Sequence, residues 1–345
     1  MESNSSGTYF ADEFTNTTAV GFDTMLFNVW NLALIIIAVY ATFSIFQSEG
    51  AKAKILSGVL ASAILAFLVY RAMGIEATAE ISVAAPIFQQ FNPFYVVALT
   101  PVSMAIFGAL ARKGKEPSAP RKIAYGMLVA AIGFMIMAVG SNGLNTPNEQ
   151  QRAIAVDKAE AFAKEYYTVA ATAEDFETLK GDAEVAATIK PATDFMGKLN
   201  KNTRPVFFDV YNASVTVLKA NEAEDNAAVA EAEASLAAIK ADTKPETRTS
   251  PYWLIFTYLI LTFAELLLSP MGISFVSKVA PPKLKGLMMG GWFVATAIGN
   301  MLVSVGGFLW AGLPLWSVWT VFIVLCLLSA LFMFIMMKRL EAVTK

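Results

Sequence analysis

A carboxylate stands inside an apolar stretch of this sequence. Glu265 lies within the run 252–276 and is followed within two turns by Ser269, Pro270 and Gly272. A charge at mid-helix costs about 2.5 to 3.5 kcal/mol on membrane-insertion scales, so it is kept mainly where it faces a cavity or a partner. Proline and glycine free backbone groups beside the acid, and transporters build sites from such broken helices. The pattern predicts a polar site with a helix break, and pairing of Glu265 with a neighbouring helix is the alternative.

Other reactive side chains are scarce. The chain has no histidine, and its single cysteine, Cys326, lies in an apolar run. Thiol catalysis, internal disulfides and His/Cys metal sites are therefore not expected. The stretch from Gly108 to Lys115 has the wrong spacing for a phosphate-binding loop and continues with Glu116. We expect neither an enzyme, nor a nucleic-acid partner, nor a bound cofactor.

The elements that must position Glu265 are membrane helices. Hydrophobic residues make up 56% of the chain and charged residues 16%, and several apolar runs reach the length of a span. This composition predicts an all-α polytopic membrane protein. Seven spans are expected, at 27–46, 55–73, 91–111, 123–139, 252–276, 287–310 and 315–337.

Basic residues in the short connections predict the orientation. They occur in 47–54, 112–122, 277–286 and after 338, whereas 74–86 and 311–315 contain none. By the positive-inside rule, the N-terminus lies outside and the C-terminus in the cytoplasm. Arg71, near the outer end of its span, is expected to reach the interface as a boundary residue. Gly286, Gly290 and Gly291 are expected to allow close helix packing.

The expected domain organisation follows from these runs. It comprises an acidic N-terminal tail outside (1–26), four transmembrane helices (27–140), an extracytoplasmic helical insertion (141–250), three transmembrane helices (251–338) and a cytoplasmic tail (339–345). The N-terminal tail has no basic residue, and it does not have the pattern of a secretory signal peptide.

The insertion is rich in alanine, glutamate and lysine. Helical runs are expected to end at Gly181, Lys190-Pro191 and Arg204-Pro205. Eight aromatic residues are enough for a small helical bundle, and a solvated stalk without a core is the alternative. The alanine-rich stretch 220–241 would suit antiparallel packing of two helices.

Several motifs in this chain resemble those of one family. Residues 264–281 (AELLLSPMGISFVSKVAP) and 286–300 (GLMMGGWFVATAIGN) resemble the "GELLxSPxGLSxxxKLAP…MMGxWFLxxxxGN" pattern of the proton-dependent oligopeptide transporters, the peptide branch of the major facilitator superfamily. Residues 88–93 (FQQFNP), 115–122 (KEPSAPRK) and 250–254 (SPYWL) resemble three further motifs of that family, in the family's order. An all-α major facilitator fold is what this resemblance implies.

The resemblance also implies roles for individual residues. In the family, the acid matched by Glu265 faces a central cavity and interacts with the amino end of the peptide. Asn92 matches an asparagine that hydrogen-bonds the peptide backbone, and the alternative is that it only starts a helix. Trp292 matches a cavity tryptophan, and the alternative is an interfacial anchor. By this resemblance the substrate-binding residues are Glu265, Asn92, Trp292 and Ser269, and the gating or helix-break residues are Pro270 and Gly272.

The departures from the family are equally informative. The family's seventh helix carries "FWxxxEQ", whereas residues 67–73 read FLVYRAM, and nothing resembles the proton-coupling "ExxERFxYY" of the first helix. The chain therefore resembles only the C-terminal six-helix half, with 27–46 as one extra helix. Rocking transporters place their sites between two halves. A separate half is thus expected to complete the site.

Three hypotheses follow from the resemblance. The first is the C-terminal half of a proton-coupled di- or tripeptide symporter of the inner (plasma) membrane, using a proton gradient and a separate N-terminal half. The second is a transport-inactive scaffold or interaction subunit of a membrane complex that anchors the insertion domain. The third is a homodimer, in which two opposed Glu265 carboxylates would repel unless one is protonated. The lipid bilayer is a partner in every case.

Overall fold

The computed structural model describes residues 6–344, with side chains described for 10–182, 184–301, 309–310 and 313–342. The chain forms two compact units. The first, here called the transmembrane unit, consists of the described residues within Met1–Gly143 and Arg248–Lys345. The second, here called the inserted unit, is Leu144–Thr247.

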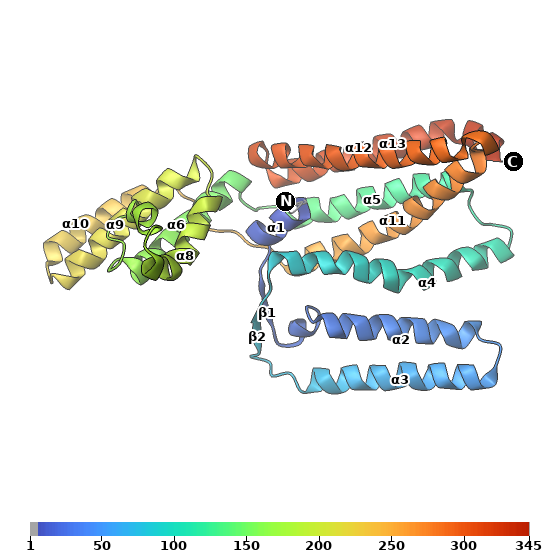
Figure 1. Cartoon of the computed structure of the whole chain (residues 1–345), viewed down its shortest axis with the longest axis horizontal. Helices are drawn as coiled ribbons and strands as arrows, with labels where there is room; N and C mark the ends of the chain where they lie inside the picture. The colour runs from blue at the N-terminus through green and yellow to red at the C-terminus, as the bar shows by residue number, and fades with distance from the viewer. Residues whose placement is uncertain (1–5, 345) are drawn as a thin grey trace. The chain divides into compact units, whose positions relative to one another are not determined.

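Six helices among the described residues are long and apolar enough to cross a membrane. The chain is thus an all-α polytopic membrane protein (Figure 1). The seventh expected span, 287–310, falls within α12 (Lys285–Gly312), which follows η3 (Pro282–Leu284) and whose side chains are only partly described. The helices that contain the six spans are α2 (Val29–Gln47), α3 (Ala51–Met73), α4 (Phe91–Arg112, preceded by η2, Ala85–Gln90), α5 (Ala119–Gly140), α11 (Pro251–Val279) and α13 (Leu315–Thr344).

Helix α5 is the centre of packing in the transmembrane unit and lies against both α11 and α13. Gly126, Gly133 and Gly140, seven residues apart, face α11. A Cβ placed on them would lie 2.8 Å from Leu268, 2.9 Å from Leu261 and 2.7 Å from Trp253, respectively. Seven residues are close to two helical turns, so the three glycines share one face. Their missing side chains let the two helices approach closely.

The glycines of α12 behave differently from expectation. A Cβ on Gly286, Gly290 or Gly291 would meet no atom within 4 Å. The prediction of close packing at these glycines is therefore wrong within this chain. The spacing of small residues does not say which glycines face a neighbouring helix closely; in this chain those of α5 do, and Gly286, Gly290 and Gly291 of α12 do not.

Helices α2 and α3 form a hairpin with its own polar link. The Asn28 side chain caps α2 by accepting from the backbone N–H groups of Trp30 (3.0 Å) and Asn31 (3.4 Å). Arg71 Nη1 of α3 donates to Oδ1 of the buried Asn31 at 2.7 Å. Arg71 was expected to act only as a boundary residue at the interface. It instead satisfies a buried amide, which explains a cation near the end of this span.

The N-terminal segment is folded where the sequence predicts a tail. Residues 6–26 contain α1 (Ser6–Phe14), β1 (Thr18–Val20) and η1 (Gly21–Met25). Strand β1 pairs antiparallel with β2 (Glu80–Ser82), with Thr18 opposite Ser82. Phe10 and Phe14, one helical turn apart, are fully buried. The sequence predicted an acidic tail here, but the i, i+4 spacing of these phenylalanines gives α1 an apolar face.

The inserted unit is a helical bundle with its own core. Its helices are α6 (Pro147–Tyr166), α7 (Asp175–Leu179), α8 (Ala183–Lys198), α9 (Thr203–Glu222) and α10 (Asn226–Lys240). All eight aromatic residues named by the sequence belong to this core or pack against it, so the solvated stalk is excluded. They are Phe162, Tyr166, Tyr167, Phe176, Phe195, Phe207, Phe208 and Tyr211.

Helix α8 corrects one expectation about the inserted unit. The sequence predicts that a helix ends at Lys190-Pro191, but α8 continues through Pro191. Ile189, Ala192 and Met196 on either side are at most 1% exposed. Burial of this apolar face offsets the hydrogen bond that proline removes from the helix.

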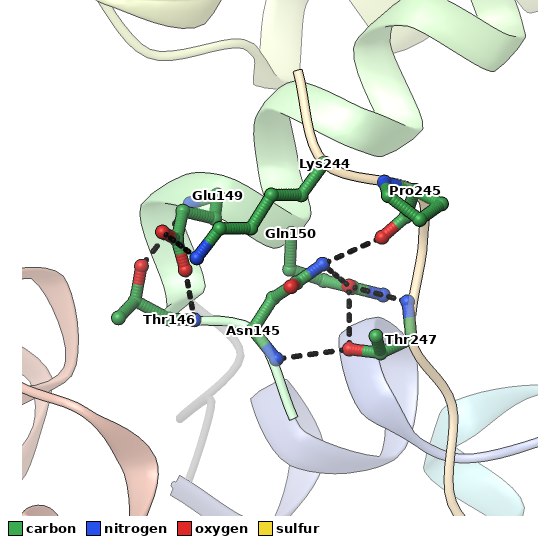
Figure 2. A network of polar contacts seen from close by, with 7 residues as sticks. All are labelled: Asn145, Thr146, Glu149, Gln150, Lys244, Pro245 and Thr247. Atoms are coloured by element: carbon green, nitrogen blue, oxygen red, sulfur yellow. Dashed lines mark hydrogen bonds and ion pairs between the residues drawn. The ribbon is translucent and has the colours of Figure 1, made fainter. Parts of the chain in front are cut away.

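A polar network joins the first and last segments of the inserted unit (Figure 2). The fully buried Gln150 accepts, through Oε1, from the Thr247 backbone N–H (3.0 Å) and from Asn145 Nδ2 (3.2 Å). Asn145 Nδ2 also donates to the Pro245 carbonyl at 2.8 Å, and its backbone N–H donates to Thr247 Oγ1 at 2.9 Å. This network, here called the neck, holds both ends of the unit together.

Glu149 lies beside the neck, in the first turn of helix α6. With Thr146 it forms a capping box, in which each side chain accepts from the other residue's backbone N–H. Lys244 Nζ lies 2.7 Å from Glu149 Oε1. This hydrogen bond, followed by that from the Thr146 backbone, lowers the pKa of Glu149 below its ordinary value of 4.5.

Candidate functional site

Four small or polar residues lie along one face of α11. Thr262, Glu265, Ser269 and Gly272 are spaced by three, four and three residues, which aligns them on a helix. The Ser250 side chain caps this helix by accepting from the Tyr252 N–H, and Pro251 occupies its first turn. We call this set the Glu265 stripe. Its ends are buried, and its middle is exposed.

At one end of the stripe, α4 contributes Asn92. Thr262 is fully buried, and its hydroxyl lies 3.0 Å from Asn92 Oδ1 and 2.7 Å from the Tyr258 carbonyl oxygen. Asn92 itself is half-buried, in the second position of α4. Its side chain therefore makes a specific contact across two helices, beyond simply starting α4.

At the other end, α12 contributes Trp292. A Cβ on Gly272 would lie 2.2 Å from Cη2 and 2.4 Å from Cζ2 of the Trp292 indole. Only glycine leaves room for this ring, which is half-buried against α11. The contact fixes Trp292 beside the stripe, about two turns along α11 from Glu265.

In the middle of the stripe, Glu265 and Ser269 are exposed. Among the described residues, no hydrogen bond or ion pair of this chain satisfies the Glu265 carboxylate. A carboxylate left bare in the apolar region of a bilayer is costly.

Helix α11 does not break at Pro270. It runs continuously from Pro251 to Val279, so the interruption expected at Pro270 and Gly272 is not seen. Proline removes one backbone donor, but a membrane helix tolerates this where neighbouring groups compensate. Gly272 instead serves as the seat for Trp292.

The structure places Glu265, Ser269 and Gly272 on this stripe, with Asn92 and Trp292 against its two ends. Pro270 lies on α11 outside this face. Sequence reasoning missed Thr262, which continues the spacing of the stripe but carries no charge. Its link to Asn92, 170 residues away, leaves no local pattern. Among the described residues, no group of three or more His, Cys, Asp or Glu side chains is arranged to hold a metal ion.

Comparison with known proteins identifies the family. The model of the POT family matches residues 55–190 and 226–308, which is more than half of the chain. The chain belongs to the POT family. The matched residues include the whole Glu265 stripe, Asn92 and Trp292.

Individual relatives match shorter stretches of this POT-family chain. Peptide transporter YePEPT of Yersinia enterocolitica is 41% identical over 58 residues, 17% of this chain and 11% of that protein. Dipeptide and tripeptide permease B of Xenorhabdus bovienii is 20% identical over 217 residues, 63% of this chain and 24% of that protein. Solute carrier family 15 member 2 of Rattus norvegicus is 31% identical over 101 residues, 29% of this chain and 14% of that protein.

The chain spans well under two thirds of the length of each of these relatives, since the alignments cover 11 to 24% of them. No solved structure matches the POT-family chain. Membership in the family, together with the apolar helices, shows a multi-pass membrane protein related to peptide transporters.

Proposed function

We propose that this chain acts as the C-terminal half of a proton-coupled di- or tripeptide symporter and needs a separate N-terminal half. The observation that carries the proposal is the exposed Glu265 carboxylate, which no described group of the chain satisfies. Two-half transporters place substrate groups at the interface of their halves. A face with an unsatisfied acid at its centre is what one such half would present.

The dimensions of the stripe fit a short peptide. At 1.5 Å per residue, Glu265 and the Trp292 seat at Gly272 are separated by roughly 10 Å along α11. An extended chain spans at most about 3.3 to 3.6 Å per residue, so about three residues reach this distance. In the proposed arrangement Glu265 answers the peptide's amino end, Asn92 and Ser269 bond its backbone, and Trp292 borders the pocket.

The proposed orientation follows the basic residues of the short connections. It places the N-terminus and the inserted unit outside the cell's inner (plasma) membrane and the C-terminus in the cytoplasm. The domain limits proposed from the sequence, 1–26, 27–140, 141–250, 251–338 and 339–345, follow this topology.

The test begins with purification of the intact chain from its native membrane in mild detergent, with mass spectrometry of what co-purifies. A six-helix partner bearing an ExxER helix is then reconstituted with the chain in vesicles. We expect accumulation of a labelled dipeptide under a proton gradient, reduced at least tenfold by Glu265→Gln. Glu49→Gln, an exposed acid between α2 and α3, is the control and should have no effect. Absence of such a half, or of uptake by the pair, would refute the proposal.

A second candidate is a transport-inactive scaffold that anchors the inserted unit in a membrane complex. It is favoured by the independent core of that unit and by Arg71, which stands in the stretch where the family carries its acidic motif. The two candidates differ at Glu265. A scaffold has little reason to keep a bare acid, so Glu265→Leu should leave its stability unchanged or raise it, without loss of complex assembly.

A further inference from the structure

Helix α1 occupies the end of the transmembrane unit at which α5 ends and α11 begins. Phe10 and Phe14 stack at 5.8 Å between ring centroids, and both contact Trp310 of α12, at 6.4 and 6.0 Å. Phe10 also lies 5.8 Å from the ring of Trp319 of α13. The rings of all four residues are at most 5% exposed. One short helix thus fills the space where α12 and α13 meet.

Polar contacts fasten α1 in this place. Trp310 Nε1 donates to Glu13 Oε2 at 3.2 Å. The Thr249 backbone N–H donates to the Phe14 carbonyl at 2.7 Å, one residue before α11 is capped. Arg248 Nη1 donates to the Thr15 carbonyl at 2.8 Å. Helix α1 is therefore bonded to α12 and to the segment that leads into α11.

Beneath the aromatic residues lies the end of α5. Trp319 Nε1 donates to Ser141 Oγ at 2.8 Å, and Ser141, 2% exposed, donates in turn to the Met137 carbonyl. The next residue, Asn142, is exposed. Solvent thus reaches Asn142 but not Ser141 while α1 and the tryptophans are in place.

Much of the described part of helix α12 is exposed. Leu287, Phe293, Val294, Ile298 and Met301 are all exposed, by 54 to 74%. The described side chains fasten α12 within the chain at two main points, Trp292 on Gly272 and Trp310 beneath α1.

We propose that α1 is a releasable clasp that seals this end of the transmembrane unit and fixes α12, and with it Trp292. A helix of nine residues is marginal by itself in water, so α1 owes its fold to the aromatic contacts and unfolds when they are lost. Release opens a path to Ser141 and frees α12 to move about its contact with Gly272. This inference does not depend on the proposed transport activity.

The experiment measures maleimide labelling of single-cysteine probes in the full chain, in detergent micelles. The background carries Cys326→Ala. Ser141→Cys reports the space beneath the clasp, Asn142→Cys is the exposed neighbour, and Ala131→Cys, at a position 1% exposed within α5, reports unfolding of the bundle. We expect fast labelling at 142, slow labelling at 141 and almost none at 131.

The clasp is then weakened by Phe10→Ala with Phe14→Ala. Labelling of the Ser141→Cys probe should rise at least about tenfold, with the Ala131→Cys probe unchanged, because local opening alone controls access. The matched control, Val20→Ala with Phe22→Ala, changes exposed residues of the same segment and should have no effect. Hydrogen exchange in α12 should rise with clasp release, while exchange in α5 stays slow.

Two outcomes would overturn the proposal: labelling at Ser141→Cys that is as fast as at Asn142→Cys in the parent chain, or labelling unchanged by loss of the phenylalanines. If the double variant also exposes the Ala131→Cys probe, the bundle has unfolded. The decision then rests on Trp310→Phe, which keeps a ring but removes the donor to Glu13. Faster labelling of Ser141→Cys in that variant supports the clasp, and an unchanged rate refutes it.

Discussion

Glycine at position 272 determines where Trp292 can lie. Because a Cβ there would come within 2.2 Å of the indole, Gly272→Ala must displace the ring or separate α11 from α12. Overpacking of this kind costs about 1 to 3 kcal/mol. We expect a lower melting temperature in detergent, recovered when Trp292→Leu is added. Gly290→Ala is the control, because nothing lies within 4 Å of its Cβ. Equal melting of both alanine variants would mean that the contact does not hold α12.

The candidate site residues could be singled out in the sequence because their chemistry is unusual for a membrane helix, and their roles in binding stay predictions. An acid, a proline and a glycine in apolar surroundings stand out, and their spacing already aligned Glu265, Ser269 and Gly272. Thr262 was not predictable in this way. Threonine is common in such helices and can bond its own backbone, so only the fold shows its contact with Asn92.

Glu149 gives the inserted unit a dependence on pH. The pKa of Glu149 in the folded state is lowered, chiefly by the hydrogen bond from Lys244. The contribution of Glu149 to the free energy of unfolding is therefore fully present above pH 4.5 and is lost as the pH falls through the lowered pKa. Glu149→Gln should therefore lower the melting temperature at neutral pH, and the difference from the parent should vanish in acid. Circular dichroism melts at a series of pH values measure this. Glu231→Gln, which replaces an exposed acid on α10, is the control. Its difference in melting temperature from the parent should not change with pH.

At the scale of elements, the glycine seam of α5 sets the position of α11. Gly133→Ala would bring a Cβ to 2.9 Å from Leu261, at a cost of about 1 to 3 kcal/mol that outweighs the gain in helix propensity of up to about 1 kcal/mol. We expect a lower melting temperature, partly restored by Leu261→Ala. In Gly108→Ala the nearest atom is the flexible end of Arg112, at 3.8 Å. That variant should be neutral or stabilised, and equal losses in both would argue against the seam.

Helix boundaries were predictable where composition changes sharply and less so at prolines. The expected spans 91–111 and 252–276 lie within α4 and α11. Pro191 and Pro270 were expected to end or break helices, yet both lie inside continuous ones. Sequence rules for proline consider the backbone hydrogen bond that it removes but not the tertiary packing on either side of it. That packing decides whether the helix continues through the proline.

At the scale of the molecule, the sequence predicted a membrane protein with a helical insertion because hydropathy and composition are averages over long stretches. The packing of α1 could not be predicted from the sequence, because Phe10 and Phe14 contact Trp319 and Trp310, which lie about 300 residues later in the chain. The neck escaped it for the same reason. Gln150 stands next to another glutamine, Gln151, and only its burial against Thr247 distinguishes it.

The neck and the separate core predict that the inserted unit folds by itself. A fragment of residues 144–247 has a closed aromatic core, and its two ends are tied through Gln150. We expect it to be helical and to unfold cooperatively. Gln150→Leu leaves the Thr247 N–H without its acceptor and takes one of two acceptors from the Asn145 amide, which keeps the Pro245 carbonyl. An unsatisfied buried group costs about 1 to 3 kcal/mol.

Thermal melts followed by circular dichroism compare the parent fragment with Gln150→Leu and with Lys164→Leu, a control at an exposed position of α6. We expect a large loss for the first and little change for the second. A fragment that is unfolded in buffer would show that the transmembrane unit is needed to hold its ends. Equal melting of the two variants would show instead that the core alone closes the unit, because the aromatic contacts would then suffice without the buried glutamine.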